Sequence, residues 1–401
     1  MFKRLCFICT ALSLLQTVQG ENPIENLRKW LESPKGNLKD QKFSQIPLNR
    51  NEAALADSLL FKHKMDLIKT QETASWKNKS FVSGNLRMPF LMKIFGSKPA
   101  NGRSLYISMH GGGSAPKEVN DAQWKNQIEL YRPKEGLYIA PRAPWDEWNM
   151  WFKSELDDFF DRLIRSAVAT YDVNPDKVYL LGYSAGGDGV WRLAPRMADR
   201  WAAASMMAGH PGDVSLVNLR NVPFMIWMGE LDDAYDRNKR AKEQGGILDS
   251  LKKNDPEGYI HETHIVQNKK HWMERVDTAA ISWMSHFERN ALATKIVWRQ
   301  EEVVKPSLYW LSVPMKEATK GKKIIAEREQ NTIILRLCDY KKLTILLNDE
   351  MLDLDKPVKI IYKDRIIYNK KISRNIGSIA RSIDERADKR AIFCSEINLT
   401  L

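Results

Sequence analysis

Residues 180–187 read Leu-Leu-Gly-Tyr-Ser-Ala-Gly-Gly, and this stretch decides how the chain is expected to fold. The apolar residues 177–182 predict a buried strand and residues 189–199 predict a helix, so Ser184 stands at a sharp turn between the two. A side chain at Gly182 or Gly186 would collide with neighbouring backbone in such a turn. The pattern predicts an α/β architecture in which Ser184, beside the positive end of a helix, is a nucleophile.

A second glycine-rich stretch lies earlier in the chain. Residues 109–114 read Met-His-Gly-Gly-Gly-Ser and follow a strand that is expected at 104–109. The backbone N–H groups of Gly111 and Gly112, together with that of Ala185, could hold an oxygen that becomes negatively charged during attack on a carbonyl. The alternative is a simple glycine-rich turn. His110 is expected to support this loop.

A serine hydroxyl is a poor nucleophile until a base accepts its proton, so a histidine should follow Ser184 in the order serine, acid, histidine. Residues 268–272, Asn-Lys-Lys-His-Trp, lie between the last predicted strand (261–267) and the last predicted helix (277–289). This is the loop in which the architecture presents its base. We therefore predict that His271 is the base.

The other histidines that follow Ser184 have different expected surroundings. His261 and His264 fall in a strand-like stretch, and His286 falls in the last predicted helix, so all three are interpreted as structural. His210 ends another predicted strand and is expected to line the substrate pocket.

The acid should come from the loop after the preceding strand, which is expected at 222–228. Residues 229–233 read Gly-Glu-Leu-Asp-Asp. A carboxylate here would hold the imidazole in the correct tautomer and stabilise its charged form. We predict Asp232 for this role, with Asp233 and Asp236 as alternatives; an acidic surface loop without function is the remaining interpretation.

Around this centre, strands and helices alternate. Strands are expected at 86–95, 104–109, 136–140, 177–182, 202–208, 222–228 and 261–267, and helices at 155–171, 189–199 and 277–289. Apolar strands separated by helices indicate a mostly parallel sheet flanked by helices, here over residues 81–294. Residues 21–80 are expected to form a mostly helical segment with Asn51 as a helix cap.

The pattern changes after about residue 294. Strands are expected at 307–313, 332–337, 343–347, 358–362, 366–372 and 391–399, with a helix at 376–386 and a hairpin turn at Lys363 and Asp364. These features predict a C-terminal, mostly-β, sandwich-like domain over residues 295–401.

Residues 1–20 have the layout of a signal peptide. Lys3 and Arg4 precede an apolar run at 5–15, and Val18 and Gly20 are small residues before a cut ahead of residue 21. The chain is therefore expected to be exported, to the periplasm or the medium, with no stable membrane insertion after cleavage. A membrane anchor is the alternative, although no stop-transfer pattern follows.

The composition bounds the class of protein. A hydrophobic fraction of 43% and a charged fraction of 28% are typical of a soluble globular chain. The net charge of +12 is spread along the sequence, and no nucleic-acid-binding module is visible, so no nucleic-acid partner is expected. Residues 261–264, His-Glu-Thr-His, are one residue short of a zinc helix motif, and no phosphate-binding loop is present. No metal and no cofactor are expected.

Two cysteines, Cys338 and Cys394, remain after signal cleavage. In an oxidising compartment they could form a disulfide, or each could be a small buried residue. Both interpretations stay open.

Residues 104–289 resemble the α/β-hydrolase superfamily, near the polyhydroxybutyrate depolymerases, feruloyl esterases and dienelactone hydrolases of bacteria. The resemblance is carried by residues 108–113 (Ser-Met-His-Gly-Gly-Gly), 140–144 (Ala-Pro-Arg-Ala-Pro), 182–187 and 271–273 (His-Trp-Met). It implies a triad of Ser184, Asp232 and His271 and an oxyanion region at Gly111, Gly112 and Ala185. Such proteins usually carry glycine before the histidine, where this chain has Lys270. The C-terminal domain resembles sandwich domains appended to exported bacterial hydrolases.

Tryptophans gather near the expected site. Trp145, Trp148 and Trp151 follow the strand at 136–140, and Trp272 stands beside His271. Aromatic walls suit sugar rings, aromatic acyl groups or polymer chains, although burial of a lid segment is an equal explanation. We predict cleavage of small-molecule or polymer carboxylic esters, of polysaccharides or aromatic acids. A serine peptidase and a catalytically degenerate glycan-binding protein are the alternatives.

Overall fold

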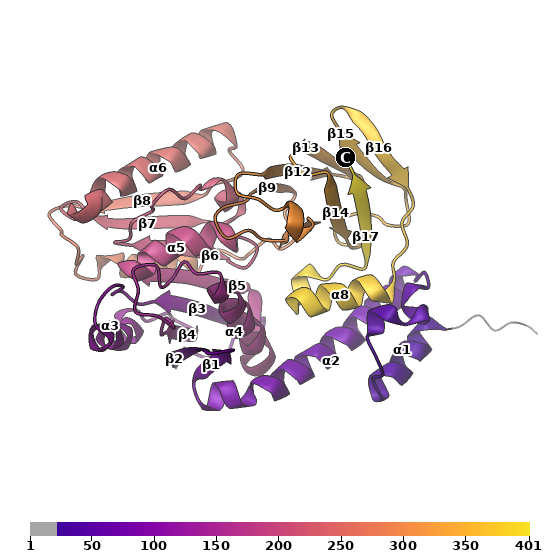
Figure 1. Cartoon of the computed structure of the whole chain (residues 1–401), viewed down its shortest axis with the longest axis horizontal. Coiled ribbons are helices and arrows are strands. Elements are labelled where there is room, and N and C mark those ends of the chain that lie inside the picture. The colour runs from indigo at the N-terminus through magenta and orange to yellow at the C-terminus, as the bar shows by residue number, and fades with distance from the viewer. Residues whose placement is uncertain (1–21) are drawn as a thin grey trace, which may run out of the picture.

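The computed structural model describes residues 22–401, so the expected signal peptide at 1–20 lies outside the described residues. Figure 1 shows a helical N-terminal segment, a central sheet covered by helices, and a C-terminal part built from two smaller sheets and a helix. Within residues 22–401, no helix has both the length and the apolar character needed to cross a bilayer.

The central sheet has eight strands in the order β1-β2-β4-β3-β5-β6-β7-β8. The strands from β3 to β8 run parallel, and β1 and β2 add an antiparallel edge. Their bounds are β1 Ser80–Ser83, β2 Leu86–Phe95, β3 Arg103–Met109, β4 Gly136–Pro141, β5 Val173–Tyr183, β6 Ala203–Met207, β7 Phe224–Gly229 and β8 His261–Val266. This is the α/β-hydrolase fold, as the sequence predicted.

Helices cover both faces of this sheet because both faces of its inner strands are apolar. The helices are α3 Lys117–Leu130, α4 Glu155–Tyr171, α5 Ala185–Arg196, α6 Arg237–Asn254 and α7 Ala279–Met284. Leu105 and Ile107 of β3 are buried in the cluster that contains α4, α5 and α6. Tyr106, between them, is buried in the cluster that contains α3 and α7. The alternation along one strand thus supplies two cores.

The N-terminal segment joins the two halves of the molecule. It contains α1 (Pro23–Glu32) and the long α2 (Arg50–Lys77), which packs on α4 of the central part and on α8 of the C-terminal part (Figure 1). The cap of α2 is Asn49 and not Asn51, so that prediction was wrong. Asn49 accepts the backbone N–H of Glu52 at 3.0 Å, and the Glu52 carboxylate accepts the N–H of Asn49 at 2.8 Å. This reciprocal pair decides where the helix begins.

The C-terminal part has a five-stranded sheet, β16-β15-β13-β12-β9, and a four-stranded sheet, β10-β11-β14-β17. The bounds are β9 Lys295–Arg299, β10 Ser307–Leu308, β11 Leu311–Ser312, β12 Lys323–Glu329, β13 Thr332–Cys338, β14 Lys342–Leu347, β15 Val358–Tyr362, β16 Arg365–Lys370, α8 Ile376–Arg386 and β17 Ser395–Thr400. Pairing is antiparallel except between β13 and β15. Alternate residues of both sheets, such as Ile324 and Ile345, are buried in one apolar cluster. The mostly-β prediction is confirmed.

Short 3-10 helices connect these elements. They are η1 Leu38–Asp40, η2 Lys42–Gln45, η3 Val217–Asn221, η4 Ala234–Asp236, η5 Val276–Thr278, η6 Met315–Glu317 and η7 Lys389–Ala391. The predicted hairpin turn is confirmed, since Lys363 and Asp364 join β15 to β16 with φ of 49° and 59°.

The last predicted helix, at 277–289, is wrong in its second half. Helix α7 ends at Met284, so His286 lies beyond the helix and is exposed. The chain then brings Arg289 into a buried group of charges. Its guanidinium lies 2.8 Å from Asp176 and 2.6 Å from Asp388, which belongs to the C-terminal part.

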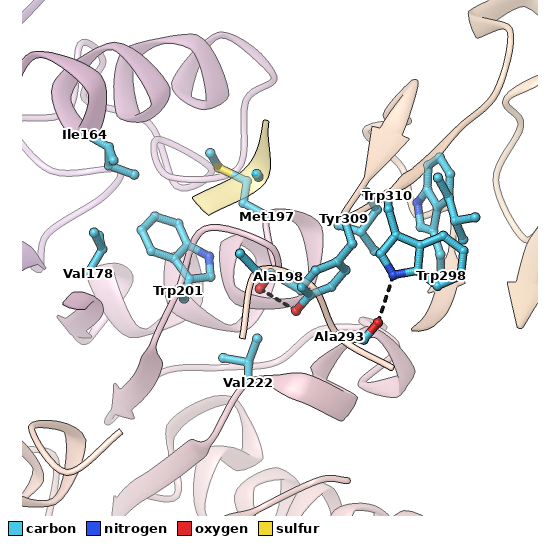
Figure 2. Close-up of a cluster of buried hydrophobic side chains, with 14 of the residues drawn as sticks. Ile164, Val178, Met197, Ala198, Trp201, Val222, Ala293, Trp298, Tyr309 and Trp310 are labelled. Atoms are coloured by element: carbon cyan, nitrogen blue, oxygen red, sulfur yellow. Dashed lines mark hydrogen bonds between the residues drawn. The ribbon is translucent and has the colours of Figure 1, made fainter. Parts of the chain in front are cut away.

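The expected strand at 307–313 is instead a hairpin whose tip enters the junction between the two halves (Figure 2). Tyr309 and Trp310 form the tip and are almost completely buried. The Tyr309 hydroxyl donates to the carbonyl of Ala198 at 2.9 Å, and the Trp310 indole donates to the carbonyl of Ala293 at 2.8 Å. Two large aromatic rings thus bury apolar area between the halves while their polar atoms stay hydrogen-bonded.

Cys338 and Cys394 are both buried as free thiols. The Cys338 sulfur contacts the carbonyl of Tyr340 at 3.7 Å, and that of Cys394 contacts the carbonyl of Leu347 at 3.8 Å. The structure therefore corresponds to the second interpretation, two small core residues, and not to the disulfide.

The buried charges give a first testable prediction. Arg289→Met would leave Asp176 and Asp388 without their shared partner, and breaking a buried ion pair typically costs about 3–5 kcal/mol. We expect a loss of this size in the free energy of unfolding, measured by urea denaturation. The matched control is Lys98→Met, because the pair of Lys98 with Asp172 is exposed and its loss should cost less than about 1 kcal/mol. Equal losses in the two variants would contradict the stabilising role of Arg289.

Candidate active site

The turn between β5 and α5 is forced by close backbone packing. A Cβ added at Gly182 would lie 2.3 Å from the carbonyl oxygen of Gly186, and one added at Gly186 would lie 2.1 Å from that of Met109. Ser184 has φ 57° and ψ −121°, a conformation that side-chain-bearing residues rarely adopt. Its N–H donates to the carbonyl of Met207 at 2.9 Å. Contacts with β3 on one side and β6 on the other therefore stabilise this strained conformation.

Three predicted side chains meet at this turn. The Nε2 atom of His271 lies 2.9 Å from Oγ of Ser184, and its Nδ1 lies 2.7 Å from Oδ2 of Asp232. The Asp232 side chain is only 2% exposed, and its other oxygen lies 3.8 Å from Arg237. A buried carboxylate in this place favours the tautomer with the proton on Nδ1, which leaves Nε2 free to accept the serine proton.

The alternatives to these residues lie elsewhere. Asp233 is exposed, and Asp236 forms an exposed ion pair with Lys239 at 2.8 Å. His261 contacts Asp249 at 3.1 Å, and His264 stacks on Trp227 with ring centroids 4.2 Å apart. None of these groups contacts Ser184 in the described structure.

Tyr183 connects the serine turn to the histidine loop through hydrogen bonds that were not predicted from the sequence. Its hydroxyl donates to the carbonyl of His271 at 2.6 Å and accepts the N–H of Met273 at 3.1 Å. Burial raises the pKa of Tyr183 above its ordinary value, so the hydroxyl keeps its proton and can donate. Two backbone groups beside the base are thus fixed from the residue that precedes Ser184.

The histidine loop accommodates Lys270 where glycine was expected. Lys270 does not adopt a positive φ, so its backbone conformation does not require glycine. Its carbonyl packs against Gly229. A Cβ at Gly229 would lie 2.1 Å from the Lys270 oxygen. The glycine that allows close approach is therefore supplied by the end of β7.

The glycine loop after β3 is held by a buried asparagine. Gly112 and Gly113 have φ of 115° and 105°, and the Asn120 side chain accepts the N–H of Gly113 at 2.9 Å. Within residues 22–401, the N–H groups of Gly112 and Ala185 have no hydrogen-bond acceptor. A Cβ at Gly111 would lie 3.2 Å from the Ser184 Cβ, so the loop lies directly against the serine. Free N–H groups beside a nucleophile can stabilise an oxyanion.

His110 supports this loop, as expected. Its Nε2 accepts the N–H of Ala143 at 3.2 Å, which places the proton on Nδ1, and Nδ1 lies 2.6 Å from the carbonyl of Gly111. Burial lowers the pKa of His110 to about 4. The ring is therefore neutral at neutral pH.

Two cavities meet at Ser184. The first, which we call the base cavity, has a volume of about 720 Å³ and is lined by His271, Trp272, Tyr183 and residues of α3 such as Gln123. The second, which we call the arginine cavity, has a volume of about 670 Å³. It is lined chiefly by Trp148, Phe152, Asp188, Arg192, His210, Tyr235 and Arg237. Ser184 and Gly112 line both cavities, so a substrate could extend in two directions from the serine.

The predicted pocket residues divide into two groups. Trp272, 48% exposed, lines the base cavity, while Trp148, 66% exposed, and His210 line the arginine cavity. Trp145 and Trp151 line neither, so these two predictions were wrong. The Trp151 ring is fully buried and donates to the carbonyl of His110 at 2.9 Å, and Trp145 is half-buried beneath Lys153. The compact turns of this segment send some rings inward and others to solvent.

The two arginines of the arginine cavity were not predicted from the sequence. Arg192 lies on α5 two turns after Ser184, and Arg237 begins α6. Their positions relative to the serine depend on α6 and the loops around it, for which no local sequence motif exists. Spacing along α5 alone could have suggested that Arg192 lies on the same side as Asp188.

No protein-family profile matches the chain, and no curated protein matches it. Among solved structures, a thermostable esterase is 19% identical with a TM-score of 0.40, and the match covers 52% of this chain and 62% of that esterase's length. A ferulic acid esterase is 13% identical with a TM-score of 0.34, covering 52% of this chain and 96% of that one. A carboxylesterase from Mesorhizobium loti is 17% identical with a TM-score of 0.37, covering 51% and 98%. Each likeness spans about half of the chain.

The buried His110 gives a prediction for pH dependence. Its pKa is about 4 in the folded chain and 6.5 ordinarily, so the unfolded chain binds this proton more readily and stability falls as the pH drops from 6.5 to 4. A difference of this size corresponds to roughly 3 kcal/mol. In His110→Gln, the loss of unfolding free energy between neutral pH and pH 4 should be smaller by about this amount.

The measurement is urea denaturation of both proteins at each pH. The exposed His286 offers a control, because His286→Gln should keep the pH dependence of the unmodified chain. If His110→Gln also kept that dependence, the neutral buried ring would not be its cause.

Proposed function

We propose that this chain is a serine hydrolase that cleaves carboxylic esters through an acyl-enzyme. The single observation that carries the proposal is the hydrogen-bonded series from Ser184 Oγ through His271 to Asp232, at 2.9 and 2.7 Å. A hydroxyl, an imidazole and a buried carboxylate in this order can activate the oxygen for attack on an acyl carbon.

In the first step, the Ser184 oxygen attacks the ester carbonyl while Nε2 of His271 takes the hydroxyl proton. The carbonyl oxygen becomes negative and accepts hydrogen bonds from the N–H groups of Ala185 and of Gly111 or Gly112. The positive end of α5, which begins at Ala185, stabilises the same charge. Asp232 stabilises the imidazolium that forms.

The tetrahedral intermediate then collapses. The bond to the alcohol oxygen breaks, and His271 gives its proton to that oxygen, so the alcohol leaves and the acyl group stays on Ser184. His271 then takes a proton from a water molecule, whose oxygen attacks the acyl carbon. The bond between this carbon and Ser184 Oγ breaks, His271 gives its proton to Oγ, and the acid leaves.

Exposed aromatic rings support an ester with a ring system as the substrate. Trp272 stands at the base cavity and Trp148 at the arginine cavity, so each direction from the serine offers an apolar ring face. Such faces suit sugar rings and aromatic acids. We include export to the periplasm or medium in the proposal, on the layout of residues 1–20.

The direct test uses a fluorophosphonate probe and a panel of p-nitrophenyl esters. Ser184→Ala should abolish labelling and lower kcat by about 10⁴–10⁶-fold, and His271→Ala should lower kcat by a similar factor, because the triad acts as one unit. Labelling of Ser184→Ala, or the absence of ester hydrolysis by the unmodified chain, would refute the proposal. A higher kcat/KM for aminoacyl amides than for esters would assign the chain to the peptidases instead.

Tyr183 is proposed as a positioning residue. Tyr183→Phe leaves the His271 carbonyl and the Met273 N–H without their partner, which should cost about 1–3 kcal/mol of stability. Because the base loses its anchor, we expect kcat to fall about 10-fold with KM changed less than about 2-fold.

The matched control is Tyr179→Phe. Tyr179 lies on the same strand, and its hydroxyl donates to the carbonyl of Phe287 at 2.9 Å, away from the site. A similar loss of stability without loss of kcat is expected there. Equal kcat values in the two variants would show that the Tyr183 contact only stabilises the fold.

A further inference from the structure

The arginine cavity is distinguished by its charged lining, because two guanidinium groups line a space that begins at Ser184. Arg192 and Arg237 both line it, and Asp188 is the one carboxylate among the described lining residues. The base cavity, by comparison, is lined by one arginine, Arg275, and one glutamate, Glu129. The two directions from the serine therefore differ in charge.

Arg192 is held in position by packing. Its guanidinium lies over the ring of Phe152 at 5.1 Å, and a Cβ at Gly212 would lie only 2.1 Å from its Nη2, so the glycine leaves room for this pose. Nη1 lies 3.2 Å from Asp213 and 3.8 Å from Glu302. Both carboxylates are largely exposed, and exposed ion pairs are weak and screened by solvent. The Arg192 charge remains available to a ligand.

Arg237 approaches the cavity from α6. Its guanidinium lies over the ring of Tyr235 at 5.0 Å, and Nη1 lies 3.8 Å from the Asp232 oxygen that does not contact His271. This separation is too long for a hydrogen bond. Arg237 therefore retains N–H groups that can donate to a ligand.

His210 and Asp188 complete the polar part of the lining. The Nδ1 of His210 accepts the N–H of Gly212 at 3.0 Å, so Nε2 carries the proton and can donate. Burial is the main cause that lowers the pKa of His210, and the nearby arginines lower it further, so the ring stays neutral. The Asp188 carboxylate accepts the backbone N–H of His210 at 2.6 Å. Two guanidinium groups, one neutral donor and one carboxylate thus form the polar lining of the cavity.

The position of His271 decides which part of an ester enters this cavity. The leaving alcohol oxygen must lie within hydrogen-bond reach of Nε2, from which it takes its proton. His271 lines the base cavity and not the arginine cavity. The alcohol part is therefore directed into the base cavity and the acyl part into the arginine cavity.

We propose that the arginine cavity binds a carboxylate carried by the acyl part of the substrate, so that half-esters of dicarboxylic acids are preferred to neutral esters. This inference rests on the proposed function. A planar guanidinium donates two parallel hydrogen bonds to a carboxylate, a geometry that lysine does not offer. Trp148 and Phe152 cover the apolar carbons between the ester and the acid group.

The test compares mono-p-nitrophenyl adipate with p-nitrophenyl hexanoate, which have the same leaving group and equal acyl length. We expect kcat/KM to be about 10-fold higher for the adipate. Arg192→Gln should remove this preference by lowering kcat/KM about 10-fold for the adipate and less than about 2-fold for the hexanoate. Arg237→Gln should lower the same ratio.

The control for charge alone is Arg240→Gln. Arg240 contributes to the electrostatic environment of His210, but it pairs with Glu243 on the exposed side of α6 and does not line the cavity. Its variant should keep most of the adipate preference. Equal kcat/KM values for the adipate and the hexanoate in the unmodified chain would overturn the inference. Hydrolysis of both esters would still leave the proposed function intact.

Two further measurements distinguish the acyl side from the alcohol side and binding from hydrolysis. If p-carboxyphenyl hexanoate is preferred to phenyl hexanoate more strongly than adipate is to hexanoate, the anion belongs to the alcohol side and the assignment is wrong. If no ester is hydrolysed, the proposed function fails, and calorimetry with monomethyl adipate still tests the cavity. Ser184→Ala should bind this half-ester at least about 10-fold more tightly than Ser184→Ala/Arg192→Gln. Equal binding would contradict the inference.

Discussion

The contact of three backbone segments at Gly182, Gly186 and Met109 is the constraint on which the candidate site depends. Because Gly182 and Gly186 have no side chains, α5 can begin directly against β3 and β5, and the chain can reverse within one residue at Ser184. The strained, positive-φ conformation at that position raises the hydroxyl above the carboxyl edge of the sheet. Every other group of the site is arranged around this fixed oxygen.

The supporting contacts come from elements that are distant in sequence. Tyr183 fixes the backbone beside His271, and Asn120 fixes the glycine loop. The neutral His110 supports the same loop through its contact with the Gly111 carbonyl. Gly229 allows β7 to approach the histidine loop closely, which removes the need for a glycine at position 270. The precision of the site thus depends on neighbouring residues that hold Ser184, His271 and the glycine loop in position.

Local motifs explain why the sheet and the residues that meet at Ser184 could be predicted from the sequence. The glycine spacing around Ser184 and the order serine, acid, histidine each impose a local requirement, and the structure brings those three side chains into contact, although their catalytic roles remain predictions. Helices α3 and α6 could not be recognised because they are polar on most of their surface, without a broad apolar stripe. The two arginines and Tyr183 were missed because their partners are set by tertiary packing. Trp145 and Trp151 were misplaced because an aromatic residue gives no indication of the direction in which its turn points it.

In the proposed reaction, Ser184 attacks an acyl carbon whose oxygen then lies against the glycine loop and the start of α5. The most direct test is a crystal structure of the chain after reaction with a fluorophosphonate. We expect a phosphorus atom bonded to Ser184 Oγ, with the phosphoryl oxygen about 3 Å from the Ala185 nitrogen and His271 on the opposite side. A phosphoryl oxygen turned away from both loops, or an adduct on another residue, would contradict it.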